Sequence, residues 1–189
     1  VTQAMAKFSY PQEDIFIRSY QPVVNGHTGQ IKKAVQMFAS AKRPVVYFGG
    51  GIVLGNAAQE LTDFVRMTGA PCVGTLMGLG AYPSSDRQFL GMLGMHGTYE
   101  ANLAMQNADV VLAVGARFDD RVVSVPSKFL EKPKKIIHVD VDPSSIAKRV
   151  KVDIPIVGNV KNVLAEMNGL LGKRESAANR DGLDKWWKN

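Results

Sequence analysis

Charged side chains follow directly on an apolar run in the middle of the chain. Residues 110–115 are apolar up to a closing glycine, and a run of this length without alternation favours a parallel strand buried on both faces. The charged residues that come next are Arg117, Asp119, Asp120 and Arg121. Ligands of open α/β sheets bind at the carboxyl ends of the strands. The stretch therefore predicts a binding site, with an ordinary surface loop of internal ion pairs as the alternative.

A glycine triplet at 49–51 follows a second apolar run, 44–48, and precedes a helical pattern. Such a loop is suited to phosphate because no Cβ blocks its approach and the helix amides carry partial positive charge. The dinucleotide fingerprint is incomplete, since the third glycine, Gly55, comes one position late. The next apolar run ends in Gly74 and Thr75 without an acidic residue to hold a ribose. Nicotinamide dehydrogenase chemistry is therefore disfavoured.

Four further strand ends have groups suited to a long, flat, anionic ligand. Residues 75–77 and 93–96 offer exposed backbone and soft methionine surface for an aromatic ring system. Arg117 can meet a phosphate with its fork of donors, and Asp140, at the end of a strand, can accept hydrogen bonds from a ribose. Methionines more often belong to a core, and Asp142 before a proline more often starts a helix, so each signal alone is weak.

The sequence contains no convincing catalytic set. The histidines His27, His96 and His138 fall on separate predicted elements; His27 suits a loop or cap, and His138 a satisfied buried group. No metal-ligand spacing, nucleophile elbow or Walker loop occurs, so we predict no catalytic and no metal-binding residues. Cys72 lies in an apolar run and is expected to pack as a small hydrophobe. A binding domain is what remains.

Composition indicates an ordinary globular chain. Its 189 residues, 46% hydrophobic and 21% charged, are enough for one domain with a real core. The net charge of +6 is scattered rather than clustered, which argues against nucleic acid as a partner. No apolar run approaches the roughly 20 residues that cross a bilayer, and no signal peptide begins the sequence. We therefore expect no membrane partner and a cytoplasmic or organelle-matrix setting, of which we favour the cytoplasm.

Apolar runs alternate with helical patterns along the chain. This order predicts an α/β fold of the Rossmann-like type, a doubly wound, six-stranded parallel sheet with helices on both faces. In the usual strand order the first and fourth strands are neighbours, which would bring the triplet at 49–51 beside residues 115–117. The expected strands are 44–48, 71–74, 89–92, 110–115, 135–143 and 154–158.

Polar residues before the helical patterns are candidate caps. Thr28, Asn56 and Thr98 are the expected N-caps of three helices. On the second and third of these helices, Met67 and Leu103 are expected to face the core. The domain organisation that we predict is an incoming linker at 1–14, a nucleotide-binding domain at 15–172, and a polar linker toward a further domain at 173–189.

Several strings of the sequence resemble the central domain of the acetohydroxyacid synthase family, also called acetolactate synthases, whose catalytic subunits are thiamine-diphosphate enzymes. The resemblance covers residues 15–171. Related enzymes of the glyoxylate carboligase and pyruvate oxidase types share the architecture but fit these strings less well. The strings are PVVYFGGGIVLGNAAQEL, TGAPCVGTLMGLGAYP, GMLGMHGTYEANLAMQNADVVLAVGARFDDRV and KKIIHVDVDPSSIAK.

The resemblance implies a function for a larger enzyme. That enzyme joins two pyruvates, or pyruvate and 2-oxobutyrate, in branched-chain amino-acid biosynthesis, and it carries FAD in this central domain without net redox chemistry. Thiamine diphosphate and magnesium are implied outside these residues, so the chain alone is expected to be inactive. Implied partners are other domains of the same chain, a homodimer or tetramer, and a regulatory small subunit. A stand-alone nucleotide-binding module and a spacer with a decayed site are the alternatives.

The resemblance also implies which residues contact the flavin. Where Asn159 stands the family often has aspartate, and asparagine can still donate or accept one hydrogen bond at this contact. Asp120 and Arg121 are implied to face a substrate-access channel. The implied cofactor-binding residues are Arg18, Gly50, Thr75, Leu76, Leu93, Gly94, Met95, His96, Gly115, Ala116, Arg117, Phe118, Asp119, Asp140, Val141, Asn159 and Val160.

Overall fold

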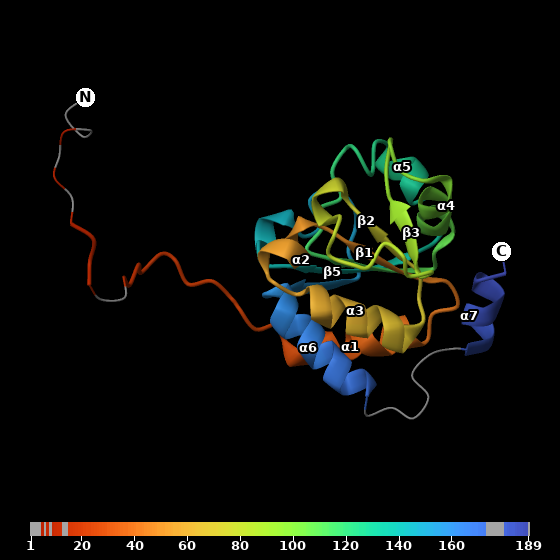
Figure 1. Cartoon of the computed structure of the whole chain (residues 1–189), viewed down its shortest axis with the longest axis horizontal. Helices are drawn as coiled ribbons and strands as arrows, with labels where there is room; N and C mark the ends of the chain where they lie inside the picture. Colours follow the sequence, from red (N-terminus) through yellow and green to blue (C-terminus); the bar gives the residue numbers. More distant parts are fainter. Residues whose placement is uncertain (1–4, 6, 8, 13–14, 173–179, 189) are drawn as a thin grey trace.

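The computed structural model describes residues 5, 7, 9–12, 15–172 and 180–188. A parallel sheet forms the middle layer, with helices packed against both of its faces (Figure 1). Its six strands lie in the order β3-β2-β1-β4-β5-β6, which confirms the predicted doubly wound topology. The strands are β1 (Pro44–Phe48), β2 (Cys72–Gly74), β3 (Phe89–Met92), β4 (Val110–Val114), β5 (Lys135–Asp140) and β6 (Ile154–Val157).

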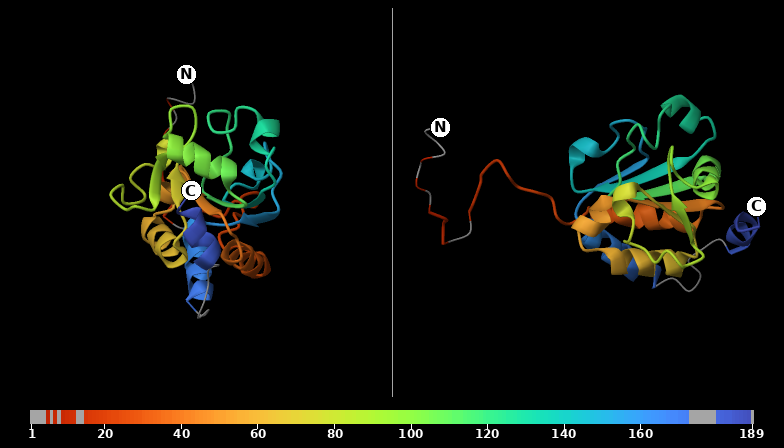
Figure 2. Two further views of the ribbon diagram at one scale, coloured as in Figure 1. Left: turned by 90° about the vertical axis from the view of Figure 1, so that its right-hand side faces the viewer. Right: turned by 45° about the horizontal axis from the view of Figure 1, so that its top comes forward.

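The helices divide between the two faces of the sheet. Helices α1, α3 and α6 cover one face, and α4 and α5 lie over the other (Figures 1 and 2). Two short 3-10 turns, η2 and η3, follow β2 and β5. The helices are α1 (Thr28–Ala39), α2 (Gly50–Leu54), α3 (Ala58–Thr68), α4 (Tyr99–Asn107), α5 (Pro126–Phe129), α6 (Val160–Leu171) and α7 (Arg180–Trp186), and the turns are η2 (Leu76–Gly78) and η3 (Pro143–Ser145).

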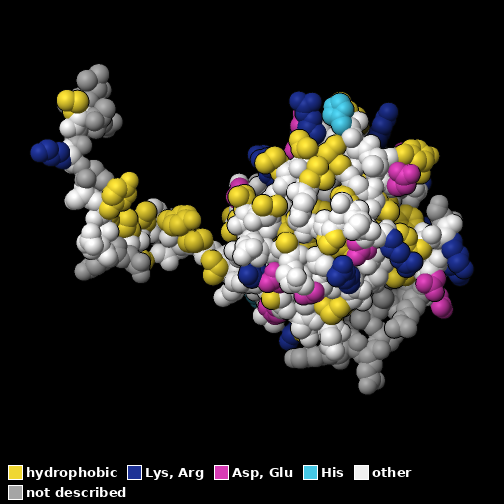
Figure 3. Space-filling model, viewed as in Figure 1, with side chains coloured by type: hydrophobic (Ala, Val, Ile, Leu, Met, Phe, Trp, Pro, Cys, Tyr) yellow, Lys and Arg dark blue, Asp and Glu magenta, His cyan; other side chains and the backbone are white. Residues whose placement is uncertain are grey.

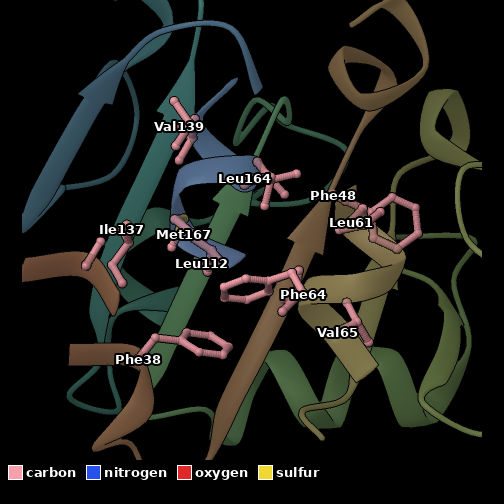
Figure 4. Packing of buried hydrophobic residues seen from close by; sticks show 14 of the residues in the cluster. Phe38, Phe48, Leu61, Phe64, Val65, Leu112, Ile137, Val139, Leu164 and Met167 are labelled. Atoms are coloured by element: carbon pink, nitrogen blue, oxygen red, sulfur yellow. The ribbon is translucent and has the colours of Figure 1, made fainter. Parts of the chain in front are cut away.

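The two central strands are buried over their whole length, as a strand covered on both faces requires. Every residue of β1 and of β4 is buried, and the two strands pair in parallel from Pro44 opposite Val110. Phe38 of α1 and Phe64 of α3 meet beneath them with ring centroids 5.3 Å apart. Figure 4 shows these rings beside Leu164 and Met167 of α6, filling the layer between the helices and the sheet.

Two of the three predicted caps are wrong. His27, not Thr28, is the N-cap of α1, since its Nδ1 accepts from the Gln30 amide at 3.4 Å. Asn56 caps no helix: the glycine triplet starts a separate turn, α2, and Asn56 lies in the left-handed bend (φ 47°) before α3 begins. Thr98 does cap α4, accepting from the Ala101 amide at 3.2 Å.

Two predicted core residues face solvent. Met67 is 44% exposed because Leu61, Phe64 and Val65 form the buried face of α3. Leu103 is 42% exposed because the buried face of α4 consists of Ala101, Ala104 and Met105. Cys72 is fully buried, as expected.

The two ends of the described chain lie at opposite ends of the sheet (Figures 1 and 2). Residues 15–24 form an extended segment that joins the body where Val24 O accepts from the Asn159 amide, just beyond β6. At the other end, α7 packs near the start of β1, and Trp186 Nε1 donates to Pro44 O at 3.2 Å. The stretch predicted as a linker at 173–189 thus contains a docked helix, and its continuation into a further domain stays a prediction.

Candidate functional site

The loops that leave the carboxyl ends of the strands are joined to one another in the order of the sheet. We call this edge the carboxyl rim and define it as residues 49–51, 75–78, 93–97, 115–121, 140–142 and 158–159. In each case a loop amide donates to a carbonyl at the end of the neighbouring strand. These bonds are Leu93 N to Gly74 O (2.9 Å), Thr75 N to Phe48 O (2.9 Å), Gly49 N to Val114 O (3.2 Å), Gly115 N to Val139 O (2.9 Å) and Gly158 N to Asp140 O (3.0 Å).

The glycine triplet packs directly on the loop after β4. The Gly51 amide donates to Gly115 O at 2.9 Å, and a Cβ added to Gly51 would lie 2.6 Å from Gly115 Cα. A Cβ on Gly49 would lie 2.5 Å from Gly115 O, and Gly115 itself has a φ of +55°. The predicted juxtaposition of 49–51 with 115–117 is therefore confirmed. Gly49 and Gly51 therefore allow this close packing of the two loops. Gly50 instead faces the loop after β2, where an added Cβ would lie 3.0 Å from Met77 Cβ.

The loop after β4 alternates between buried and exposed side chains. Ala116 and Phe118 are buried, at 3% and 4% exposure, so only their backbone can face a ligand. Arg117 between them is exposed, and its carbonyl accepts from the Tyr47 hydroxyl at 2.8 Å. The structure thus presents the Arg117 guanidinium outward from a loop whose neighbours are fixed in the core.

Asp119 has an unused acceptor beneath this loop. Its Oδ1 is buried and has no hydrogen-bond partner among the described residues. A buried oxygen without a partner costs free energy, so it marks a place where a donor from a ligand or water fits. Burial raises the pKa of the Tyr47 hydroxyl above its usual range, the nearby Asp119 carboxylate raises it further, and Arg117 opposes both.

His138 of β5 is buried under the same loop. Its Nε2 lies 2.9 Å from Ala116 O, which can only accept, so Nε2 carries the proton. Burial lowers the pKa of His138, while Asp140 and the bond to Ala116 O oppose that shift. The expectation of a satisfied buried histidine holds for one ring nitrogen only, since Nδ1 has no partner among the described residues.

The end of β5 presents a carboxylate beside an exposed aliphatic residue. Asp140 is mostly buried, its side chain 14% exposed; Oδ1 accepts from the Asp142 amide at 2.9 Å, and Oδ2 lies 4.0 Å from His138 Nε2. Val141 is exposed. Asp142 accepts from the Ser144 amide and starts η3, as its position before a proline predicts.

At the end of β6 the side chains already have structural roles. Asn159 Oδ1 caps α6 by accepting from the Lys161 amide at 2.9 Å, which leaves the side-chain NH₂ for any further bond. Val160 is 5% exposed and packs near Gly55, so its side chain cannot reach a ligand at the rim.

The two methionine loops expose apolar side chains along the rim. Leu76, Met77 and Met95 are 69%, 75% and 67% exposed, in agreement with the predicted apolar surface, whereas Leu93 is buried. Part of the exposed apolar surface of the molecule is visible in Figure 3.

The loop after β3 packs on the far end of the loop after β4. Gly94, with a φ of +106°, would place a Cβ 2.6 Å from Arg121 O, and the Met95 amide donates to the same carbonyl at 3.2 Å. His96 lies on this loop, and Asp120 and Arg121 lie opposite it; all three are exposed. The predicted flavin loop and the predicted channel residues are therefore neighbours.

Arg18 is not brought to these loops. It lies on the extended segment 15–24, whose residues are exposed. Its role stays a prediction, as do the other ligand contacts inferred from the resemblance.

Sequence reasoning missed two features near the rim. Tyr47 and His138 bond to carbonyls of the loop after β4 from inside the core. A lone tyrosine hydroxyl in an otherwise apolar buried strand was the available signal, since a buried hydroxyl needs a partner.

The second feature is a groove of about 310 Å³ beside α4. It is lined by Leu93, Tyr99, Asn102, Leu103, Met105, Gln106, Val122 and Phe129. Its lining is largely apolar, and it adjoins the rim only at Leu93.

Two kinds of site are absent from the part of the chain that the structure describes. No three His, Cys, Asp or Glu side chains gather there to hold a metal ion. No helix within those residues has the length and apolar character needed to span a bilayer.

Comparison with protein families gives the rim its context. Residues 31–167 match the family model described as "Thiamine pyrophosphate enzyme, central domain". The chain belongs to this family. The matched residues contain the whole sheet and all of the rim. The match begins at Ile31, within α1.

Individual relatives of this central domain carry more specific names. The chain is 50% identical to the acetolactate synthase large subunit of Haemophilus influenzae over 96% of its own length and 32% of the relative's. It is 48% identical to the acetolactate synthase isozyme 3 large subunit of Escherichia coli (93% and 30%) and 43% identical to the acetolactate synthase of Mycobacterium avium (99% and 30%). The chain thus spans about a third of the length of these relatives.

Proposed function

We propose that the chain is the FAD-holding central domain of an acetolactate synthase large subunit. The whole enzyme would condense two pyruvates to 2-acetolactate, or pyruvate with 2-oxobutyrate, in branched-chain amino-acid biosynthesis. Identity of 50% to a large subunit over 96% of this chain supports the choice of enzyme. The convergence of the glycine triplet with the Arg117 loop carries the proposal of a nucleotide site, because it sets a loop without side chains beside one exposed guanidinium at a single edge.

The donor set at the rim fits the parts of FAD. The exposed Arg117 suits the diphosphate, since a guanidinium forms charge-assisted, forked hydrogen bonds with phosphate oxygens. Asp140 suits a ribose hydroxyl, and Asp119 Oδ1, which has no partner among the described residues, can accept from a further ligand donor. The exposed Met77 and Met95 offer polarizable surface to a flat ring. Bound FAD would supply a redox-active isoalloxazine ring, which the proposed net reaction does not use.

We further propose that catalysis needs parts of the enzyme outside these residues. Thiamine diphosphate and magnesium would be bound by other domains of the same chain, with assembly into a homodimer or tetramer and a regulatory small subunit as a partner. Asp120 and Arg121 would then border the substrate channel, and Arg18 would reach the flavin from the segment that enters at the rim. On this proposal the chain alone forms no acetolactate, and the enzyme works in the cytoplasm.

A titration with FAD and, separately, with NAD⁺ tests the proposed function. We expect saturable binding of FAD and none of NAD⁺ at the same concentration. Arg117→Ala should weaken FAD binding by about 1.5 to 3 kcal/mol, the range for a charged hydrogen bond, which is roughly tenfold to 150-fold in Kd. Arg43→Ala is the matched control, because Arg43 is an exposed arginine directly before β1, at the other end of that strand. NAD⁺ preference, or equal effects of the two variants, would contradict the proposal.

A further inference from the structure

Tyr47 and His138 occupy one row of the sheet on either side of β4. Tyr47 of β1 pairs with Ala113, and Ala113 pairs in turn with His138 of β5. Side chains at matched positions of parallel strands lie on the same face. The smallest of the three, Ala113, therefore leaves space between a tyrosine and a histidine on the face covered by α4 and α5.

The loop after β4 folds back into that space. The centroid of the Phe118 ring lies 5.3 Å from that of the Tyr47 ring and 5.4 Å from that of the His138 imidazole, which it meets edge to face. All three side chains are buried, at 4% exposure or less. These contacts anchor Phe118 in the core, three residues after Gly115.

The same two side chains also hold two successive carbonyls of this loop. His138 Nε2 donates to Ala116 O at 2.9 Å, and the Tyr47 hydroxyl donates to Arg117 O at 2.8 Å. Each bond is made inside the core, where an unpaired carbonyl would be costly. With both carbonyls turned inward and Phe118 anchored, the Arg117 side chain is left to point outward.

We infer that Tyr47 and His138 are positioning residues for the ligand site: they fix the backbone of residues 116–118 and thereby place the Arg117 guanidinium and the Asp119 carboxylate at the rim. Neither side chain contacts the ligand, since both are buried beneath the loop. The inference rests on the proposed flavin site for its functional consequence, whereas the structural part stands on the two hydrogen bonds alone. A purely structural role would instead predict that loss of either bond lowers stability without a specific effect on the loop.

Tyr47→Phe tests the hydroxyl bond with almost no change in shape. Its control is Thr68→Val, which also removes one buried hydroxyl that donates to backbone carbonyls (Phe64 O at 2.9 Å and Val65 O at 3.1 Å), but within α3. We expect both variants to lose stability. Only Tyr47→Phe should speed amide hydrogen exchange across residues 115–123 and raise the Kd for FAD by about threefold to tenfold, the equivalent of one hydrogen bond.

His138→Gln and His138→Leu test the second bond by rescue. Glutamine can place an amide N–H near the position of Nε2, whereas leucine cannot donate. We expect His138→Gln to keep FAD affinity within about twofold of the wild type and His138→Leu to lose about tenfold. The ¹⁵N shifts of the wild-type imidazole should report a neutral ring with its proton on Nε2.

The possible outcomes separate the two proposals. Equal loop exchange in Tyr47→Phe and Thr68→Val, or a proton on Nδ1, would overturn the inference whatever the chain binds. Absence of FAD binding in the wild type would overturn the proposed function, while the exchange experiment would still decide the structural part. Should His138→Leu fail to fold, Tyr47→Phe and the imidazole shifts decide alone.

Discussion

The two ends of the parallel sheet use their polar groups differently. At the amino end of β4, Asp109 accepts from the Lys42 and Arg43 amides, both at 2.9 Å, and so joins the start of β1 to that of β4. Close by, Trp187 Nε1 of the α7 region donates to Gly69 O at 2.9 Å, just before β2. These polar groups form hydrogen bonds with one another within the chain. We therefore call the amino ends of the strands the closed end of the sheet.

At the carboxyl rim, polar and apolar groups are left available. Arg117 is exposed, Asp119 Oδ1 is buried without a partner among the described residues, and Leu76, Met77 and Met95 face solvent. A fold that leaves such groups at one edge keeps that edge for a ligand or another domain. On the proposed function, the sheet supports stability at its amino end and binding at its carboxyl rim, so substitutions at the two ends should separate these properties.

The largest effect is expected from Gly115→Ala at the rim. A Cβ there would lie 2.7 Å from Gly51 Cα, and the φ of +55° disfavours any side chain. Overpacking and left-handed strain together predict a loss of about 2 to 4 kcal/mol in the free energy of unfolding, measured by urea denaturation, and loss of FAD binding. Gly169→Ala in α6, where a Cβ meets nothing within 4 Å, should instead stabilise the protein by about 0.5 to 1 kcal/mol. A neutral Gly115→Ala would contradict the close contact between the two loops.

Asp109→Ala should have the next largest effect, at the closed end. Two backbone amides lose their acceptor, so we expect a loss of about 1 to 3 kcal/mol in unfolding free energy. FAD affinity measured by titration should stay within twofold of the wild type under conditions where both proteins are folded. A specific loss of FAD affinity would show that the two ends are not separable.

Acid should reduce stability through His138. The folded state lowers the pKa of this buried imidazole, whereas the unfolded state keeps an ordinary value near 6.5. The unfolded chain therefore binds more protons below about pH 6.5: the stabilisation is fully present above that pH and is lost as the pH falls toward the folded pKa. This group can add at most about 1.4 kcal/mol per pH unit to the slope of the unfolding free energy against pH. Urea denaturation between pH 7.5 and 5 should give a shallower slope for His138→Gln than for the wild type, and equal slopes would contradict the prediction.

Trp187→Phe should have the smallest effect. It removes the hydrogen bond to Gly69 O and weakens the contact with Arg87, whose guanidinium carbon lies 5.8 Å from the ring centroid. We expect a loss of about 1 kcal/mol in thermal or urea unfolding and no change in FAD affinity. A change in affinity would mean that docking of the α7 region is coupled to the rim.

The strand order could be predicted from the sequence because its signal is local and strong. Uninterrupted apolar runs such as 110–114 mark buried parallel strands, and the chirality of crossovers then leaves few arrangements. Exact helix starts could not be predicted in the same way. At α1, Thr28 and His27 are both able to cap, and backbone geometry selects His27. Before Asn56, a separate short helix starts at the glycine triplet, which packs closely on Gly115 at the end of a strand distant in sequence, and no local propensity encodes that contact.

The candidate site was predictable at the level of loops but not of side chains. Glycine and charge patterns locate the ends of β1 and β4, yet they do not reveal that Phe118 and Val160 are buried or that Asn159 is used as a cap. These outcomes depend on what lies across the sheet. Tyr47 and His138 are the clearest case, because their shared row with Ala113 appears only when strands distant in sequence are paired.

Mapping amide chemical-shift changes during an FAD titration of the ¹⁵N-labelled chain tests the central claim most directly. The account predicts that the largest changes fall on the carboxyl rim, at residues 49–51, 75–78, 94–97 and 115–119, with little change in α7 or around Asp109. Changes centred on the groove beside α4 or on the amino ends of the strands, or no changes at saturating FAD, would contradict it.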